Sequence, residues 1–231
     1  TEVKEGATNL AGISSAFEPG SIFKPVTMLA ALEEGTTQAG QVYTCPEVVY
    51  ADEYTISDAH ERPTEDMDTR QIMAESSNVG MSLIAHDLTF EKLYAYIQRY
   101  QITENPNTDY PGCASGYVSN WTDWSDVQGY NISFGQGIEV TPMEMVRFYG
   151  ALANNGYANT PHFLLDVPTN TDKKTFDSSE IISNKQAISD LTYMMEGVVE
   201  EGTATDAQIE GYTVAGKTGT AEFASASGGY E

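Results

Sequence analysis

The stretch Glu18-Pro19-Gly20-Ser21-Ile22-Phe23-Lys24-Pro25 decides the expected fold of this 231-residue chain. Its first three residues form a turn, and the apolar spacing that follows predicts a helix over Ser21–Glu34. Pro25 then lies in the first helical turn, where its missing N–H costs little. Ser21 and Lys24 are three residues apart, so the hydroxyl and the amine share one face of the helix. This spacing is typical of a serine nucleophile beside a lysine base.

Two more short motifs follow in order along the chain. Ser76-Ser77-Asn78 marks a break between two predicted helices, Thr69–Ala74 and Val79–His86. Lys217-Thr218-Gly219 falls within a predicted strand over Gly211–Thr220. Each motif is a weak signal by itself, but the three agree in order, spacing and structural context. Together they indicate one site built from distant segments.

The predicted strand needs partners, because a single strand cannot form a sheet. We expect them within Gln41–Tyr54 and Phe163–Phe176, or outside this chain. The remaining pattern is mainly helical, and Gln101–Gly137 is expected to be loops with short elements. The pattern as a whole therefore indicates a protein in which helices dominate and clear strand signals are few.

Helix-start signals locate three further helices. Thr89 is expected to cap a helix over Phe90–Tyr100. Thr141-Pro142-Met143-Glu144 is a capping box with proline at the first helical position, so it predicts a helix over Pro142–Ala153. Ser183-Asn184-Lys185-Gln186 is interpreted as a second capping box, which begins a long helix that extends to Gly202.

The chemistry of these motifs can be argued from the residue types. A lysine acts as a base only when burial and a nearby positive charge lower its pKa, and Lys217 is the candidate for that charge beside Lys24. Ser76 is suited to relay a proton to a leaving amine. Asn78 both donates and accepts hydrogen bonds, which suits the recognition of a substrate amide.

The third motif is suited to binding a peptide that ends in a carboxylate. Lys217 offers a cation and Thr218 a hydroxyl, while Gly219 lets a peptide lie against the backbone. The backbone N–H groups of Ser21 and Thr220 could form an oxyanion hole.

Charge excludes several classes of partner. Lys plus Arg number 11 against 34 for Asp plus Glu, which gives a formal net charge of −23. Nucleic acid and anionic membrane surfaces are disfavoured, because both need clustered cations. The histidines show no metal-ligand spacing and no cofactor motif is visible, so no metal or cofactor is expected. Cys45 and Cys113 are either two buried thiols or one disulfide, and a disulfide is expected only if the protein is exported.

Beyond the three motifs, the chain resembles the transpeptidase domain of class B penicillin-binding proteins, the cell-division and elongation type. The resemblance rests on four segments that span essentially the whole chain: Phe17–Pro25, Glu75–Gly80, Phe134–Pro142 and Val214–Glu222. It implies an α+β fold like that of penicillin-binding proteins and serine β-lactamases, with a helical subdomain packed on an antiparallel sheet. Part of that sheet is expected to be missing from this chain.

The resemblance also implies an activity and a set of site residues. The activity is cross-linking of peptidoglycan stem peptides through D-Ala-D-Ala, with β-lactam antibiotics as suicide substrates. Ser21 is the implied acylated nucleophile, Lys24 its base and Ser76 the proton relay. The residues implied to hold the substrate are Asn78, Lys217, Thr218, Gly219 and Thr220.

In that family the domain has strands before the nucleophile helix and further strands after the third motif. We therefore expect residues 1–231 to be an incomplete transpeptidase core, without the N-terminal pedestal, the membrane anchor and the C-terminal strands. The implied location is the outer face of the bacterial cell membrane, with anchoring by a segment not in this chain. The implied partners of the full-length protein are membrane proteins of the division or elongation machinery.

Related functions use the same motifs and stay open at this point. A serine β-lactamase is disfavoured, because no Glu-x-x-Leu-Asn type loop lies between Asn78 and Lys217 and because Asn78 departs from the Ser-x-Val motif of class D enzymes. A D,D-carboxypeptidase uses the same site with water as acceptor. A β-lactam sensor domain acylates without catalysis, and a wall-binding scaffold does neither.

Overall fold

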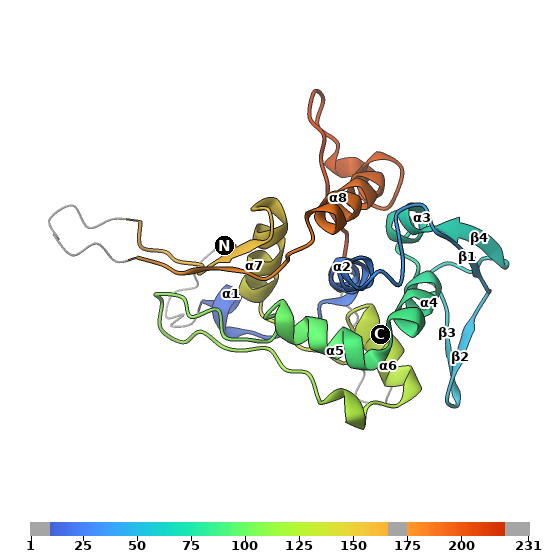
Figure 1. Ribbon diagram of the computed structural model, residues 1–231, viewed down its shortest axis with the longest axis horizontal. Helices are drawn as coiled ribbons and strands as arrows, with labels where there is room; N and C mark the ends of the chain where they lie inside the picture. Colours follow the sequence, from blue (N-terminus) through green and yellow to red (C-terminus); the bar gives the residue numbers. More distant parts are fainter. Residues whose placement is uncertain (1–9, 166–174, 220–231) are drawn as a thin grey trace, which may run out of the picture. The chain divides into compact units, whose positions relative to one another are not determined.

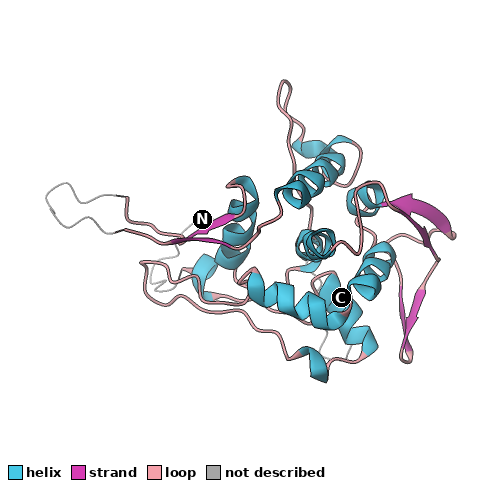
Figure 2. Ribbon diagram, viewed as in Figure 1, coloured by secondary structure: helices cyan, strands magenta, loops and turns pink. Residues whose placement is uncertain are grey.

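The computed structural model of the chain describes residues 10–165 and 175–219. The chain divides into two units, which are described separately. The first unit comprises Thr1–Phe17, Ile97–Val118 and Glu139–Ser183, and the second comprises Glu18–Tyr96, Ser119–Ile138 and Asn184–Glu231. Among the described residues, helices dominate and strands occur as short antiparallel pairs (Figure 2). This is the α+β pattern expected from the sequence.

The first unit is built around one helix and one strand pair. Its elements are α1 (Ala11–Ser14), α7 (Pro142–Ala153), β5 (Tyr157–Asn159) and β6 (Ser178–Glu180). α1 and β5 contact α7, and β5 pairs antiparallel with β6. The predicted capping box is confirmed, because the Thr141 side chain accepts from the Glu144 N–H and the Glu144 carboxylate accepts from the Thr141 N–H.

The second unit contains the motif-bearing elements. Its helices are α2 (Lys24–Glu34), α3 (Thr69–Ala74), α4 (Asn78–Leu88), α6 (Asp126–Ser133) and α8 (Lys185–Glu200), with 3-10 turns η1 (Gly20–Phe23), η2 (Trp121–Asp123) and η3 (Thr205–Ala207). Its strands are β1 (Val42–Cys45), β2 (Val49–Ala51), β3 (Tyr54–Ile56) and β4 (Glu65–Asp68). Helix α5 (Phe90–Arg99) begins in this unit and ends in the first, close to the predicted bounds.

Helix α2 is the core of the second unit. Every residue from Lys24 to Leu32 is buried, because α2 contacts α4 on one side and α8 on another (Figure 1). α3 packs on α8, and α4 also contacts α6. The segment contains no charged side chain between Lys24 and Glu33, so it can be surrounded by apolar neighbours. Lys24 is thereby the one charged side chain in the buried run.

Two helix starts differ in detail from the prediction. The predicted helix over Ser21–Glu34 begins as the 3-10 turn η1 and becomes α-helical at Lys24, with Pro25 in the first turn as expected. The interpretation of Ser183 as the cap of α8 is wrong. Asn184 is the cap, because its side chain accepts from the N–H groups of Gln186 and Ala187.

The predicted strand over Gly211–Thr220 is not present in its described part. Residues 211–219 contain no strand, and residue 220 lies outside the described residues. The suggested partners within Gln41–Tyr54 pair elsewhere, β1 with β4 and β2 with β3. The suggested partner segment Phe163–Phe176 lies largely outside the described residues. Because no described strand pairs with residues 211–219, the strand pattern lacks the hydrogen-bonding neighbour that it requires.

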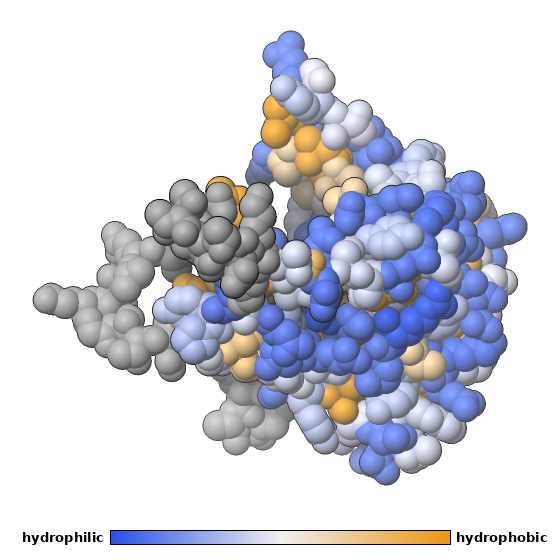
Figure 3. Space-filling view, turned by 60° about the vertical axis from the view of Figure 1, so that its left-hand side comes forward, coloured by the Kyte–Doolittle hydropathy of each residue, from blue (hydrophilic) through white to orange (hydrophobic). Residues whose placement is uncertain are grey.

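The polarity of the surface, the state of the cysteines and the hydropathy of the helices can be compared with the sequence. The face in Figure 3 is predominantly hydrophilic where residues are described, as the net charge of −23 predicts. Cys45 and Cys113 form no disulfide with each other; Cys45 is buried as expected, whereas Cys113 is only half-buried, which the expectation of two buried thiols missed. Burial raises the pKa of Cys45 to about 11. Within residues 10–165 and 175–219, no helix is both long and apolar enough to span a membrane.

Candidate active site

The turn that carries Ser21 is held by a close backbone approach. Gly20 donates from its N–H to the Gly135 carbonyl oxygen at 2.9 Å. A Cβ added at Gly135 would lie 2.1 Å from the Gly20 carbonyl oxygen, and the φ of Gly135 is +93°. Only glycine fits there. The Phe134–Pro142 segment quoted for the resemblance therefore has a physical role, since it supports the serine turn.

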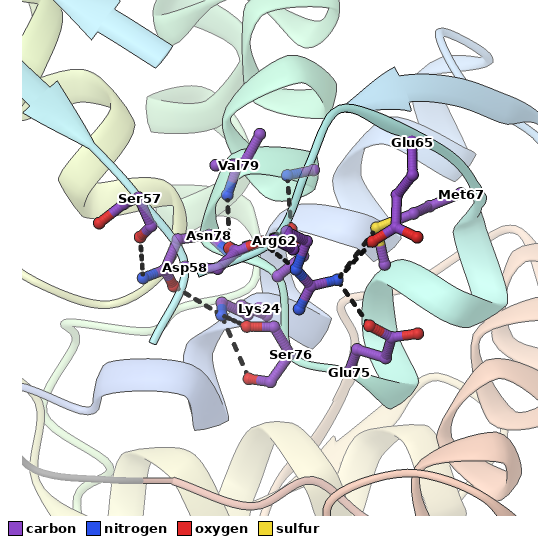
Figure 4. A network of polar contacts seen from close by, with 12 residues as sticks. Lys24, Ser57, Asp58, Arg62, Glu65, Met67, Glu75, Ser76, Asn78 and Val79 are labelled. Carbon is purple, nitrogen blue, oxygen red and sulfur yellow. Dashed lines mark hydrogen bonds and ion pairs between the residues drawn. The ribbon is translucent and has the colours of Figure 1, made fainter. Parts of the chain in front are cut away.

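Lys24 reaches from α2 to the second motif, as Figure 4 shows. Its Nζ donates to the Ser76 carbonyl oxygen at 2.5 Å and to Asn78 Oδ1 at 2.8 Å, and it lies 3.2 Å from Ser76 Oγ. The side chain is fully buried. Motif residues more than 50 positions apart are thus in direct contact.

Lys217 approaches the same hydroxyl from the third motif. Its Nζ donates to Ser76 Oγ at 2.8 Å, and to the Thr218 carbonyl oxygen and Oγ1 at 3.1 and 3.3 Å. The two lysine amines therefore meet at one hydroxyl. This arrangement confirms the predicted approach of Lys217 to Lys24.

Burial and charge set the ionisation of both lysines. Desolvation, with the positive charge of Lys217 as the second cause, lowers the pKa of Lys24 well below its usual value. Desolvation lowers the pKa of Lys217 to about 8. A neutral Lys24 has two N–H groups, which match the two carbonyl oxygens of Ser76 and Asn78. Its lone pair is then left for a hydroxyl hydrogen, which is the state that a general base needs.

The Ser21 side chain lies one helical turn before Lys24, in η1, and is half-buried. Among the described residues its hydroxyl has no hydrogen-bond partner, so the predicted contact with Lys24 is not made. The third motif nevertheless lies against this turn, because a Cβ added at Gly219 would be 2.7 Å from Ile22 Cγ2. The structure thus brings together seven predicted site residues: Ser21, Lys24, Ser76, Asn78, Lys217, Thr218 and Gly219. Thr220, the eighth, lies outside the described residues.

The sequence did not single out Thr203, which connects the second and third motifs. Its hydroxyl is 2.5 Å from Thr218 Oγ1, and its N–H donates to the Ala74 carbonyl oxygen at 3.1 Å. Ala74 ends α3, two residues before Ser76. No local pattern marks Thr203, because both partners are distant in sequence.

If the site is acylated as the resemblance implies, Thr203→Val should slow acylation by roughly tenfold, because Thr218 loses the partner that orients its hydroxyl. Thr203→Ser should restore the rate, since it keeps the hydroxyl. The control is Thr192→Val, which removes a hydroxyl bonded to the Ile188 carbonyl oxygen within α8. Stopped-flow measurement with a chromogenic β-lactam tests this, and equal rates for Thr203→Val and Thr192→Val would contradict it.

The chain matches a known protein family over nearly its whole length. Residues 3–231 match the penicillin binding protein transpeptidase domain family. The chain is 31% identical over 221 residues to penicillin-binding protein PbpB of Mycolicibacterium smegmatis, which covers 91% of this chain and 34% of that protein. It is 32% identical over 219 residues to stage V sporulation protein D of Bacillus subtilis, covering 90% of this chain and 33% of that protein.

The fold of the chain is similar to that of a solved structure. Penicillin binding protein 3 from Mycobacterium tuberculosis, complexed with aztreonam, superposes with a TM-score of 0.89 at 27% identity, covering 98% of this chain and 53% of that one. The chain spans about a third of the length of the curated relatives it matches. The resemblance drawn from its motifs is confirmed, and so is the expected fold class. With the family match extending over residues 3–231, the chain belongs to the penicillin-binding protein transpeptidase domain family.

Proposed function

We propose that this chain is the acyl-transfer core of a serine D,D-transpeptidase that cross-links peptidoglycan stem peptides. The observation that carries the proposal is the meeting of two lysine amines at Ser76 Oγ, beside the turn that carries Ser21. The pKa of the buried Lys24 amine is lowered well below its usual value, as a base requires, and the Lys217 amine, with a pKa of about 8, can be protonated to bind an anion. The curated relatives include proteins named as probable peptidoglycan D,D-transpeptidases, which supports the same reaction.

The first half-reaction is acylation of Ser21. Its Oγ bonds to the carbonyl carbon of the penultimate D-alanine while its proton passes to Lys24 Nζ. The C–N bond to the terminal D-alanine then breaks, and the leaving amine takes a proton through Ser76 Oγ. Lys217 and Thr218 bind the terminal carboxylate, and Asn78 binds the peptide amide.

The second half-reaction transfers the acyl group. The amine of a second stem peptide attacks the Ser21 ester carbon and loses its proton to Lys24 Nζ. The ester C–O bond then breaks, and Lys24 Nζ returns the proton to Ser21 Oγ. Backbone N–H groups of Ser21 and Thr220 would stabilise the oxyanion in both halves. β-Lactams acylate Ser21 in the same way but leave no departing fragment, so the adduct persists.

Acyl transfer and acyl-enzyme lifetime test this proposal together. The purified protein is incubated with a model D-Ala-D-Ala peptide and a labelled D-amino acid, and separately with a labelled penicillin. We expect exchange of the label into the peptide and penicillin release over hours. Release within seconds would indicate a β-lactamase, and acylation without exchange would indicate a sensor domain.

The second-order acylation rate constant is expected to have a bell-shaped pH profile, since it reports the free enzyme. It rises with pH through the lowered pKa of Lys24, which must be neutral. It falls above about pH 8, because Lys217 loses the charge that binds the carboxylate. Each pH unit beyond a limb lowers the rate about tenfold. In Lys217→Arg the alkaline limb should disappear, because arginine stays charged. An unchanged alkaline limb in that variant would contradict the role of Lys217.

Further elements of the proposal concern the whole protein. It acts on the outer face of the bacterial cell membrane, where peptidoglycan is built, and an anchor outside this chain holds it there. Its partners are peptidoglycan stem peptides, β-lactam antibiotics and membrane proteins of the division or elongation machinery. The M. tuberculosis relative complexed with aztreonam supports the β-lactam part.

A further inference from the structure

A buried carboxylate lies behind the second motif. Asp58 follows β3, and its side chain is 3% exposed. Its Oδ1 accepts from the N–H groups of Asn78 and Val79 at 2.5 and 3.0 Å. Both carboxylate oxygens also lie within 3.1 Å of Ser77 Oγ. Asp58 therefore satisfies free N–H groups at the start of α4 from a loop about 20 residues away.

Arg62 fixes that carboxylate and reaches the other side of the same turn (Figure 4). Its Nε lies 3.1 Å from Asp58 Oδ2, and its Nη1 lies 2.5 Å from Glu75 Oε2 and 3.6 Å from Glu65 Oε1. The Arg62 side chain is 14% exposed. Glu75 directly precedes Ser76. Arg62 therefore holds the turn at residue 75, and Asp58 holds it at residues 77–79.

The turn between α3 and α4 needs such support. Ser76 has a φ of +57°, a left-handed conformation that a non-glycine residue rarely adopts. Within residues 10–165 and 175–219, the hydrogen bonds of Lys24 Nζ all go to this turn, to the Ser76 carbonyl oxygen, Ser76 Oγ and Asn78 Oδ1. Any relaxation of Ser76 would move every one of these partners relative to the amine.

We infer that Asp58 and Arg62 are positioning residues for acylation, which hold Ser76 and Asn78 in place against the Lys24 amine. The inference rests on the proposed function, because its readout is acylation. Three charged groups act on the Lys24 amine: the negative Asp58 and the positive Arg62 and Lys217. Asp58 raises the pKa of Lys24 and Arg62 lowers it, both more weakly than desolvation and Lys217.

Opposite charges give a test that separates positioning from general stability. In Asp58→Asn and Arg62→Gln, the acylation rate constant with a fluorescent penicillin should fall by about tenfold to a hundredfold at its pH optimum. The acid limb should move by about half a pH unit, to lower pH in Asp58→Asn and to higher pH in Arg62→Gln. Arg62→Lys keeps the positive charge but loses the planar guanidinium that contacts Asp58 and Glu75 together. Its acylation rate constant should therefore fall, while the acid limb of its pH profile stays in place.

The matched control is Glu144→Gln, which neutralises another buried carboxylate that caps a helix. Glu144 accepts from the N–H groups of Thr141 and Gly116 in the first unit. This variant should lose stability in thermal unfolding without moving the acid limb.

The possible results distinguish failure of the positioning inference from failure of the proposed function. If wild type is acylated and both variants match its rate and limb, the inference is wrong while the proposed function stands. Limbs that move in the same direction in both variants also overturn it. If Asp58→Asn does not fold, the limb of Arg62→Gln decides. If folded wild type is not acylated, the proposed function fails and the inference fails with it.

Discussion

Replacing Ser21 by alanine is expected to abolish covalent labelling by a fluorescent penicillin. The hydroxyl is the atom that forms the ester, so its loss should reduce acylation by at least ~10⁴-fold, below detection. The fold should be unaffected, because the Ser21 hydroxyl has no hydrogen-bond partner among the described residues and the side chain is half-buried. In-gel fluorescence against time, together with thermal unfolding, measures both.

The control for this variant is Ser14→Ala, which removes a hydroxyl bonded to the Leu10 carbonyl oxygen in α1. It should label at the wild-type rate. Ser76→Ala should label more slowly but still detectably, since a relay only assists the proton transfer. Wild-type labelling of Ser21→Ala would rule out the assigned nucleophile.

Replacing Lys24 by methionine is the second change with a large expected effect. General base catalysis contributes about 10²–10⁴-fold, so acylation should fall by about 10³-fold. The free energy of unfolding should fall by less than about 2 kcal/mol, because methionine fills similar space and removes the desolvation penalty of a buried amine. Acylation kinetics and denaturant unfolding of the same preparation separate catalysis from stability.

The pH dependence of stability gives this variant an independent check. The folded protein lowers the pKa of Lys24, whereas the unfolded chain keeps a value near 10.5. Between these two values the unfolded state binds more protons, so the contribution of Lys24 makes unfolding less favourable as pH rises. Lys24→Met should lose that increase up to about pH 10.5. Identical pH slopes in the two proteins would show that Lys24 is not held neutral.

Local signals in the sequence predicted most helices correctly. Thr141 and Glu144 form the predicted capping box, because both partners lie within one turn of each other. The α8 cap shows the limit of such signals. Ser183 and Asn184 are both suitable caps, and Asn184 takes the role while its N–H donates to Glu33 Oε1 at 3.0 Å. This hydrogen bond joins residues 151 positions apart, so no local sequence pattern could predict it.

The third motif failed as a strand prediction for a similar reason. Gly211–Gly219 has strand-like residue types, but strand formation depends on a paired neighbour, which no described segment provides. The three motifs in order still predicted which distant segments approach one another, although the Ser21 hydroxyl makes no contact with Lys24 among the described residues. Lys24, Ser76 and Lys217 meet as the motif chemistry predicted.

The supporting residues could not be predicted from the sequence. Asp58 lies about 20 residues before the backbone groups that it accepts from, and Thr203 is 15 residues from Thr218. Neither spacing corresponds to a helix or strand period. Such residues become visible only when the fold brings the segments together, which is why buried polar contacts in the structure add to the site that the motifs define.

Peptide mapping by mass spectrometry after penicillin treatment tests the assigned chemistry most directly. The folded protein should carry one penicilloyl group, and fragmentation should locate it on Ser21. The adduct should be absent from Ser76, although that hydroxyl lies beside both lysine amines. An adduct on any residue other than Ser21, or none on folded protein, would contradict the assignment.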